Sequence, residues 1–168
     1  SASGNTKLRL FGKVYTKSVA AGAFFSQENI NTHFYGYTPG ENVNRDAIQQ
    51  SYNISSLGVD IENAAPSDFN YSLKTGFSYL YDAYKAVESE VDLNFNSGYK
   101  IADDQKIILR ADYFLIARKD ELINPAPRHL FKVAPAYTFS PIEKLLLTAG
   151  INTAYENDVT GKNKSFHV

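Results

Sequence analysis

Three histidines are the only imidazole side chains in this sequence, so acid–base or metal chemistry built on histidine must use His33, His129 or His167. His129 follows a polar segment in which Asp120 and Glu121 supply carboxylates, and an imidazole beside a carboxylate can act as a general base. No nucleophile motif accompanies them, and no two histidines have metal-ligand spacing. We therefore expect no enzyme activity, no catalytic residue and no metal or cofactor site.

Charged residues form a more regular pattern, because they alternate with apolar residues along several segments. Glu88, Glu90 and Asp92, for example, occupy even positions between the apolar or small residues around them. In a β-strand such charges share one face, where they either line a water-filled lumen or are merely solvated and balance one another. The predicted lumen-facing charges are Lys74, Glu88, Glu90, Asp92, Arg110, Asp112, Arg118 and Lys132.

Antiparallel pairing across the short 102–105 turn makes this prediction specific. It should place Glu88 opposite Arg118. The same register should place Asn96 opposite Arg110.

The elements that position these charges are long two-faced strands, of which the segment 69–81 is the clearest. Its odd positions are apolar, aromatic or Thr, while its even positions are mostly small or polar. A period of two predicts a strand with one apolar face and one wet face. The run is longer than a usual strand of about 5–6 residues and long enough to cross a bilayer, which takes about 9–11 tilted residues.

The same alternation recurs along the chain, so we expect an all-β, antiparallel up-and-down meander of about eight long strands. This meander is a transmembrane β-barrel or a section of one, and residues 1–168 form a single barrel domain or a fragment of a larger barrel. In the third strand the apolar positions switch from even (Ile54) to odd (Leu57), which predicts a bulge near 55–56. The expected strands are 7–16, 19–34, 48–61, 69–81, 87–101, 107–117, 131–139 and 145–155, with the start of another at 166–168.

The expected connections alternate in length. Short ones fall at 17–18, 63–67, 102–105 and 140–143, while longer polar ones fall at 29–47, 119–128 and 157–165. Short turns at one end and long loops at the other are typical of bacterial outer-membrane barrels.

Aromatic residues gather toward the ends of several apolar faces. This placement indicates interfacial girdles, where amphipathic rings lie at headgroup depth, although tyrosines also cap the rims of β-sandwich cores. The residues predicted to face lipid or form the girdles are Phe69, Tyr71, Phe77, Tyr79, Tyr81, Phe95, Tyr99, Tyr113, Tyr137, Phe139 and Tyr155.

Composition agrees with this prediction and excludes other classes. The chain has 168 residues, no cysteine, a formal net charge of -1 and 14% aromatic residues. Zero cysteine excludes disulfide frameworks and cysteine chemistry, and the balanced charge gives no reason to expect nucleic-acid binding. No signal-peptide pattern occurs at 1–6, so we expect any export signal to lie outside this sequence.

Several segments together resemble the TonB-dependent-receptor-like outer-membrane β-barrels of Bacteroidetes-type Gram-negative bacteria. The resemblance implies that the chain is an internal fragment of a longer barrel in the bacterial outer membrane, and it includes no plug-like segment. The segments are 33–37 (HFYGY), 69–73 (FNYSL), 78–84 (SYLYDAY), 86–90 (AVESE), 122–124 (LIN), 147–150 (LTAG) and 155–158 (YEND).

Two functions are consistent with this pattern. They differ in whether the apolar residues of the strands face outward, toward lipid, or inward, into the barrel. The first is a porin- or receptor-like outer-membrane barrel that passes or binds a solute through a polar lumen. Its expected partners are outer-membrane lipid, a small solute, and further strands or a partner lipoprotein, with no nucleic acid. The alternative is a soluble β-barrel that holds a lipophilic ligand inside, with its odd positions turned inward.

Overall fold

The computed structural model describes residues 4–33, 49–83, 85–120, 127–142, 144–157 and 164–167. No helix in these ranges is long and apolar enough to cross a membrane. The described residues form ten strands: β1 (Gly4–Tyr15), β2 (Val19–His33), β3 (Gln49–Asn63), β4 (Phe69–Asp82), β5 (Val87–Ala102), β6 (Gln105–Lys119), β7 (Arg128–Ile142), β8 (Leu145–Gly150), β9 (Thr153–Asn157) and β10 (Lys164–His167).

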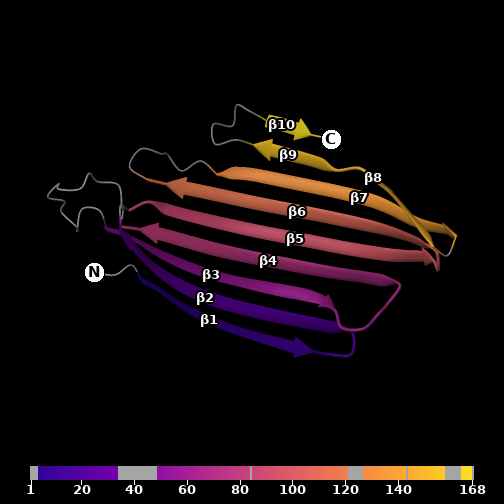
Figure 1. The fold of residues 1–168 in the computed structure, drawn as a ribbon, viewed down its shortest axis with the longest axis horizontal. Helices are drawn as coiled ribbons and strands as arrows, with labels where there is room; N and C mark the ends of the chain where they lie inside the picture. Colours follow the sequence, from indigo (N-terminus) through magenta and orange to yellow (C-terminus); the bar gives the residue numbers. More distant parts are fainter. Residues whose placement is uncertain are drawn as a thin grey trace.

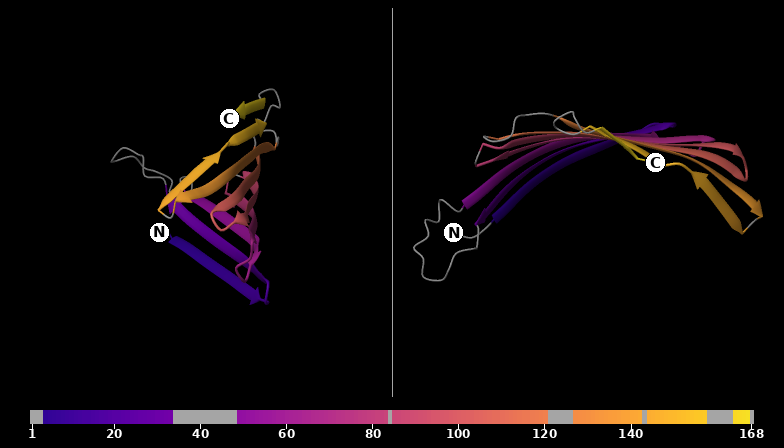
Figure 2. Two further views of the ribbon diagram at one scale, coloured as in Figure 1. Left: turned by 90° about the vertical axis from the view of Figure 1, so that its right-hand side faces the viewer. Right: turned by 90° about the horizontal axis from the view of Figure 1, so that it is seen from above.

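All ten strands belong to one antiparallel sheet, in the order β1 to β7 followed by β9 and β10, with β8 also paired to β7 (Figure 1). Each pairing joins neighbours in sequence apart from that of β7 with β9, which follows β8, so the predicted all-β antiparallel meander is confirmed. Within the described ranges β1 pairs only with β2 and β10 only with β9, so the sheet is open. It is twisted and arched rather than flat (Figure 2).

The register keeps one set of side chains on each face. From β2 to β9 odd residues lie opposite odd residues, so Phe25 faces Leu57, and Leu57 in turn faces Phe77. β1 has the opposite parity, because Tyr15 pairs with Ala20 across the first turn. We define the apolar face as the odd residues of β2–β9 with the even residues of β1. The polar face carries the remaining residues.

The predicted eighth strand is divided in two, and a proline explains the division. Pro135 of β7 lies between the last partner of β8 and the first partner of β9. Its carbonyl accepts a hydrogen bond from Ile151 N at 3.1 Å, but proline has no N–H with which to return one. The ladder therefore loses a bond at this point, and two segments replace one strand.

The predicted bulge near 55–56 is wrong. β3 pairs with β2 and with β4 in an unbroken register through these residues. Tyr52 and Ile54 lie on the polar face, near the end of the sheet where β2 ends and β3 begins. The register shifts that do occur are at Lys100–Ala102 and at 139–142, both next to short turns.

Connections sort by length between the two ends of the sheet. Residues 16–18, 64–68, 103–104 and 143–144 link strands at one end, here called the turn side (Figure 1). The strand ends on either side of 34–48, 83–86, 120–127 and 158–163 lie at the other end, the loop side. This arrangement agrees with the predicted alternation in length, except that 83–86 has four residues while 64–68 has five.

The sheet has no conventional hydrophobic core among the described residues. The buried hydrophobic side chains there are two alanines, Ala20 and Ala86. Large apolar residues remain exposed instead, such as Phe77 at 37%, Ile107 at 46% and Tyr99 at 52%. Soluble proteins bury such residues, so the apolar face needs another apolar medium.

Glycines on the polar face make room for larger neighbours. Gly58 of β3 lies opposite Phe24 of β2, and an added Cβ at Gly58 would overlap the Phe24 ring. A ring packed over a glycine helps to fix the register of the two strands.

Gly58→Val should therefore lower the free energy of unfolding by about 1–3 kcal/mol, because the new side chain displaces Phe24. Urea unfolding of the full-length protein in phospholipid vesicles measures this loss. Gly12→Val on β1 is the control, since a Cβ at Gly12 meets nothing within 4 Å. Equal stability of the two variants would contradict the packing role of Gly58.

Candidate functional site

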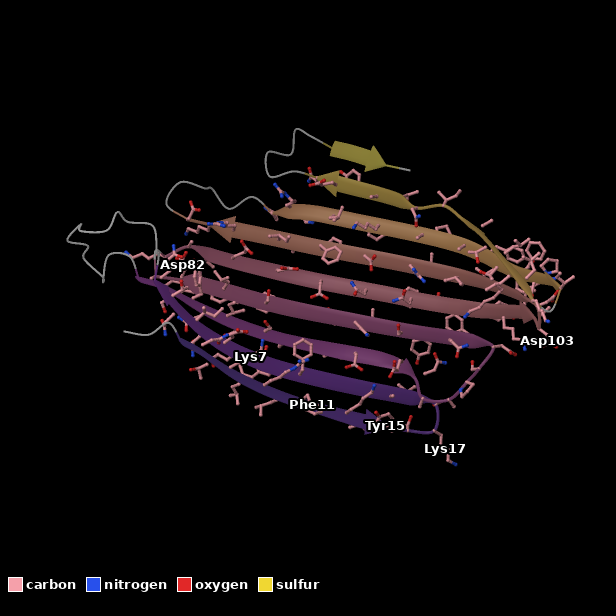
Figure 3. The ribbon with its side chains drawn as sticks, viewed as in Figure 1. Lys7, Phe11, Tyr15, Lys17, Asp82 and Asp103 are labelled. Atoms are coloured by element: carbon pink, nitrogen blue, oxygen red, sulfur yellow. The ribbon has the colours of Figure 1, made fainter. Side chains whose placement is uncertain are left out.

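The polar face gathers the charges that the sequence singled out. The register puts all eight predicted charges on this face, across β4 to β7, and all eleven predicted girdle residues on the apolar face. Asp82 and Asp103 mark its loop-side and turn-side ends (Figure 3).

Three more cations of this face lie on β1, and the sequence interpretation missed them. Lys7, Arg9 and Lys13 occupy the odd positions of β1, opposite even residues of β2. Their alternation with Leu8 and Leu10 was visible, but the reversed parity of β1 separated them from the later pattern. Lys7, Phe11 and Tyr15 trace this edge of the sheet in Figure 3.

Lys13 links β1 to β3 across the intervening strand. Its Nζ lies 2.6 Å from Glu62 Oε1 and 3.6 Å from Asp60 Oδ2. Strands two apart are separated by about 9.6 Å, so the lysine must cross over β2. Gly22 lies between Lys13 and Asp60 in the register and carries no side chain to block the path.

A second cluster joins β1 to β2 nearer the loop side. Glu28 accepts hydrogen bonds from Lys7 Nζ and from Asn5 Nδ2, each at 2.7 Å. Both ends of the edge strand are thus tied to the sheet by charge-assisted contacts.

The predicted cross-strand partners of β5 and β6 face each other. Glu88 lies opposite Arg118, and their charged groups approach to 3.9 Å. Arg118 also contacts Asp120 at 3.5 Å. Asn96 lies opposite Arg110 as predicted, but the described residues show no hydrogen bond between their side chains.

One more ion pair crosses the C-terminal strands. Arg128 of β7 lies 4.0 Å from Glu156 of β9. With the pairs above, it leaves a polar face on which opposite charges largely neutralise each other.

Glycines and serines hollow the polar face over β2 to β4. A hollow of about 270 Å³ is lined by Phe24, Gly76, three serines and charged residues from β1 and β5. The Arg9 guanidinium lies 5.5 Å from the centre of the Phe24 ring, in cation–π geometry. A second hollow of about 420 Å³ lies beside Arg110 and Lys132.

Aromatic residues of the apolar face form pairs near the turn side. The rings of Phe69 and Tyr71 are 5.9 Å apart, and those of Tyr137 and Phe139 are 6.0 Å apart. The Tyr137 hydroxyl donates a hydrogen bond to Gln105 at 2.9 Å. Rings with an apolar body and a bonded polar tip suit a membrane–water interface.

His129 is an odd residue of β7 and lies on the apolar face. Its Nδ1 lies 3.0 Å from the Tyr113 hydroxyl, and Leu115 is its partner on β6. The contact with Tyr113 links β7 to β6. The side chains of His33 and His167 and the predicted partner Glu121 lie outside the described residues.

Metal binding is a further chemistry to consider on the described surface. No group of three or more potential metal ligands occurs among the described residues.

At the turn side, a hydrogen bond from Lys100 at 2.5 Å holds the pKa of the Asp103 carboxyl below its usual value. That carboxyl therefore stays charged at neutral pH and gives up its bond only on acidification.

Comparison with solved structures shows a similar fold in OmpT, an outer membrane protein of Vibrio cholerae that was folded in vitro. The TM-score is 0.61 at 14% sequence identity, and the match covers 96% of this chain and 50% of that chain. The present chain thus has the fold of an outer-membrane β-barrel wall and spans half the length of this neighbour. No protein-family model and no curated protein matches the sequence.

Lys13 tests how far ion pairs stabilise the polar face. Lys13→Gln should lower the free energy of unfolding only slightly, since both partners are exposed to solvent. The loss should shrink in 1 M salt, where the Debye length is about 3 Å. Urea unfolding of the full-length protein at low and high salt measures both effects.

Lys17 is the matched control, since it lies in the first turn and forms no ion pair within the described ranges. Lys17→Gln should leave stability unchanged at either salt concentration. A loss for Lys13→Gln that did not depend on salt would show that the lysine acts through packing instead.

Proposed function

We propose that this chain forms part of the wall of a porin-like barrel in a bacterial outer membrane. Its polar face lines a lumen through which a small solute passes, and its apolar face contacts lipid. The observation that carries the proposal is the row of large apolar side chains exposed along the apolar face from β2 to β9, whereas on the polar face Phe11 and Tyr15 of the edge strand are also exposed.

The length of the apolar stripe supports this assignment. From Phe69 to Tyr81 the stripe of β4 covers twelve residue steps, or about 40 Å along the strand. A strand tilted by about 40° would rise about 30 Å over that length, which matches the thickness of the hydrocarbon core.

On the loop side the apolar face of β2 and β3 becomes polar, at the level of Tyr79 and Tyr81 of β4. The positions that continue this face are Gln27 opposite Ser55 and Asn29 opposite Asn53. Long loops standing above a membrane are typical of the outer surface of such barrels.

A soluble barrel with a lipophilic ligand would need the apolar face turned into a shared interior. The exposure of Phe77 and Tyr99 on an arched, open sheet favours contact with lipid instead. A receptor-like role of the TonB-dependent kind, which the sequence resemblance implies, would add a plug and energy coupling. Porin-like passage needs only the lumen wall, so we prefer it.

We also expect the protein to have no catalytic activity, since its transport role needs none. Its partners on this proposal are outer-membrane lipid, the transported solute, and the further strands that close the barrel. The open edges of β1 and β10 supply unpaired backbone groups for those strands, and no spanning sheet can leave such groups in lipid.

A charge placed on the apolar face tests the proposal. Ala111 of β6 lies among Phe95 and Val133 near the middle of the apolar stripe. Ala111→Arg should cost about 2–4 kcal/mol of membrane stability, the range for arginine facing lipid at mid-depth. Insertion of the full-length protein into phospholipid vesicles, followed by urea unfolding, measures the loss.

Two control variants keep the test specific. Asn94→Arg places the same side chain on the polar face of β5, and Arg110→Ala removes a charge from that face. Both should insert normally. Equal tolerance of Ala111→Arg and Asn94→Arg would overturn the assignment of the two faces.

A further inference from the structure

The charges of the polar face differ in whether a partner neutralises them. Lys7, Lys13 and Arg118 each contact a carboxylate. Within the described ranges, Arg110, Lys132, Glu90 and Asp92 form no ion pair, and the same holds for Arg9, Lys74, Lys106 and Asp112 of this face. The uncompensated charges are therefore the ones whose fields reach a passing solute.

On β5 to β7 the uncompensated charges separate along the strands, except that Asp112 lies opposite Lys132. Glu90 and Asp92 lie two residues apart on β5, toward the loop side. Arg110 lies opposite Ala134, two residues beyond Lys132, so the two cations are diagonal neighbours about 7–8 Å apart. Asp92 is four residues from Asn96, the partner of Arg110, which corresponds to about 13 Å along the sheet.

The cationic end has room for a ligand. Arg110, Asp112 and Lys132 border the hollow of about 420 Å³, whose other lining residues include Ala134, Asn152 and Thr153. Two cations against one carboxylate leave this hollow with a net positive charge. A carboxylate group would pair there with Arg110 in the bidentate geometry that guanidinium groups favour.

We propose that the polar face selects short zwitterionic peptides, and this inference rests on the proposed porin-like function. The peptide carboxylate binds beside Arg110 and Lys132, and its ammonium group binds beside Glu90 and Asp92. An extended chain spans about 3.3–3.6 Å per residue, so a peptide of about four residues covers the separation of about 13 Å. Solutes with one charge, or with none, make only part of these contacts.

The test uses the full-length protein in planar lipid bilayers, with interruptions of the ion current as the readout. The probes are tetraalanine with free termini and the same tetrapeptide with an acetylated amino end and an amidated carboxyl end. Free tetraalanine should interrupt the current at least about threefold more often, a ratio in the range expected for exposed charge contacts.

Arg110→Gln combined with Lys132→Gln should reduce this ratio to about one while the open-pore current persists. Asp92→Asn should reduce it as well. Arg118→Gln is the matched control, because Arg118 lies on the same strand and face as Arg110 but already contacts Glu88 and Asp120. Its ratio should stay at that of the unmodified protein.

The possible outcomes distinguish a failure of this inference from a failure of the proposed porin-like function. An ion current with equal interruption by both peptides overturns the selectivity and leaves the porin-like function intact. A threefold preference that survives loss of both Arg110 and Lys132 overturns the assigned residues. Failure of the properly inserted protein to conduct any ions overturns both the inference and the proposed function.

Discussion

The unbroken antiparallel register is the constraint on which the rest of the structure depends. Side chains alternate between faces with a period of two, so a slip of one residue in a strand would move all its rings to the polar face. From β2 to β7 each pair of strands meets without such a slip over the described residues, except beside short turns. Both the apolar stripe and the clustered charges follow from this single regularity.

Sequence periodicity was sufficient to predict β4 to β7 and the Glu88–Arg118 partnership, because each strand there keeps one parity from end to end. It failed in β3, where Tyr52 and Ile54 are apolar residues on the polar face. At the loop side of β2 and β3 both faces carry mixed residues, since Gln27 lies opposite Ser55 on the apolar face and Ile30 lies opposite Tyr52 on the polar face. A change in apolar parity then marks the end of the stripe rather than a bulge.

Two other features could not be read from hydrophobic pattern alone. The division into β8 and β9 depends on Pro135, a residue of the neighbouring strand, so it appears only once the register is known. The cations of β1 became part of the polar face only through the pairing of Tyr15 with Ala20. Pairing across strands therefore carries information that the alternation within one strand lacks.

Whether two charged residues form an ion pair is harder still to predict from the sequence. Lys13 reaches β3 because Gly22 leaves space above β2, while Lys132 lies beside Asp112 and forms no ion pair with it. Alternating charge along a strand predicts the face of each residue. It does not predict which charges stay uncompensated, because that depends on side-chain length and on the neighbours that block or open a path.

The two faces thus carry separate physical tasks. Transfer of the apolar stripe into lipid stabilises the sheet, whereas exposed ion pairs contribute little free energy. Charges on the polar face can therefore change with small effects on folding, provided that the register and the apolar stripe persist. Substitution of the uncompensated groups near Arg110 and Asp92 should therefore change the charge of the polar face without loss of the fold.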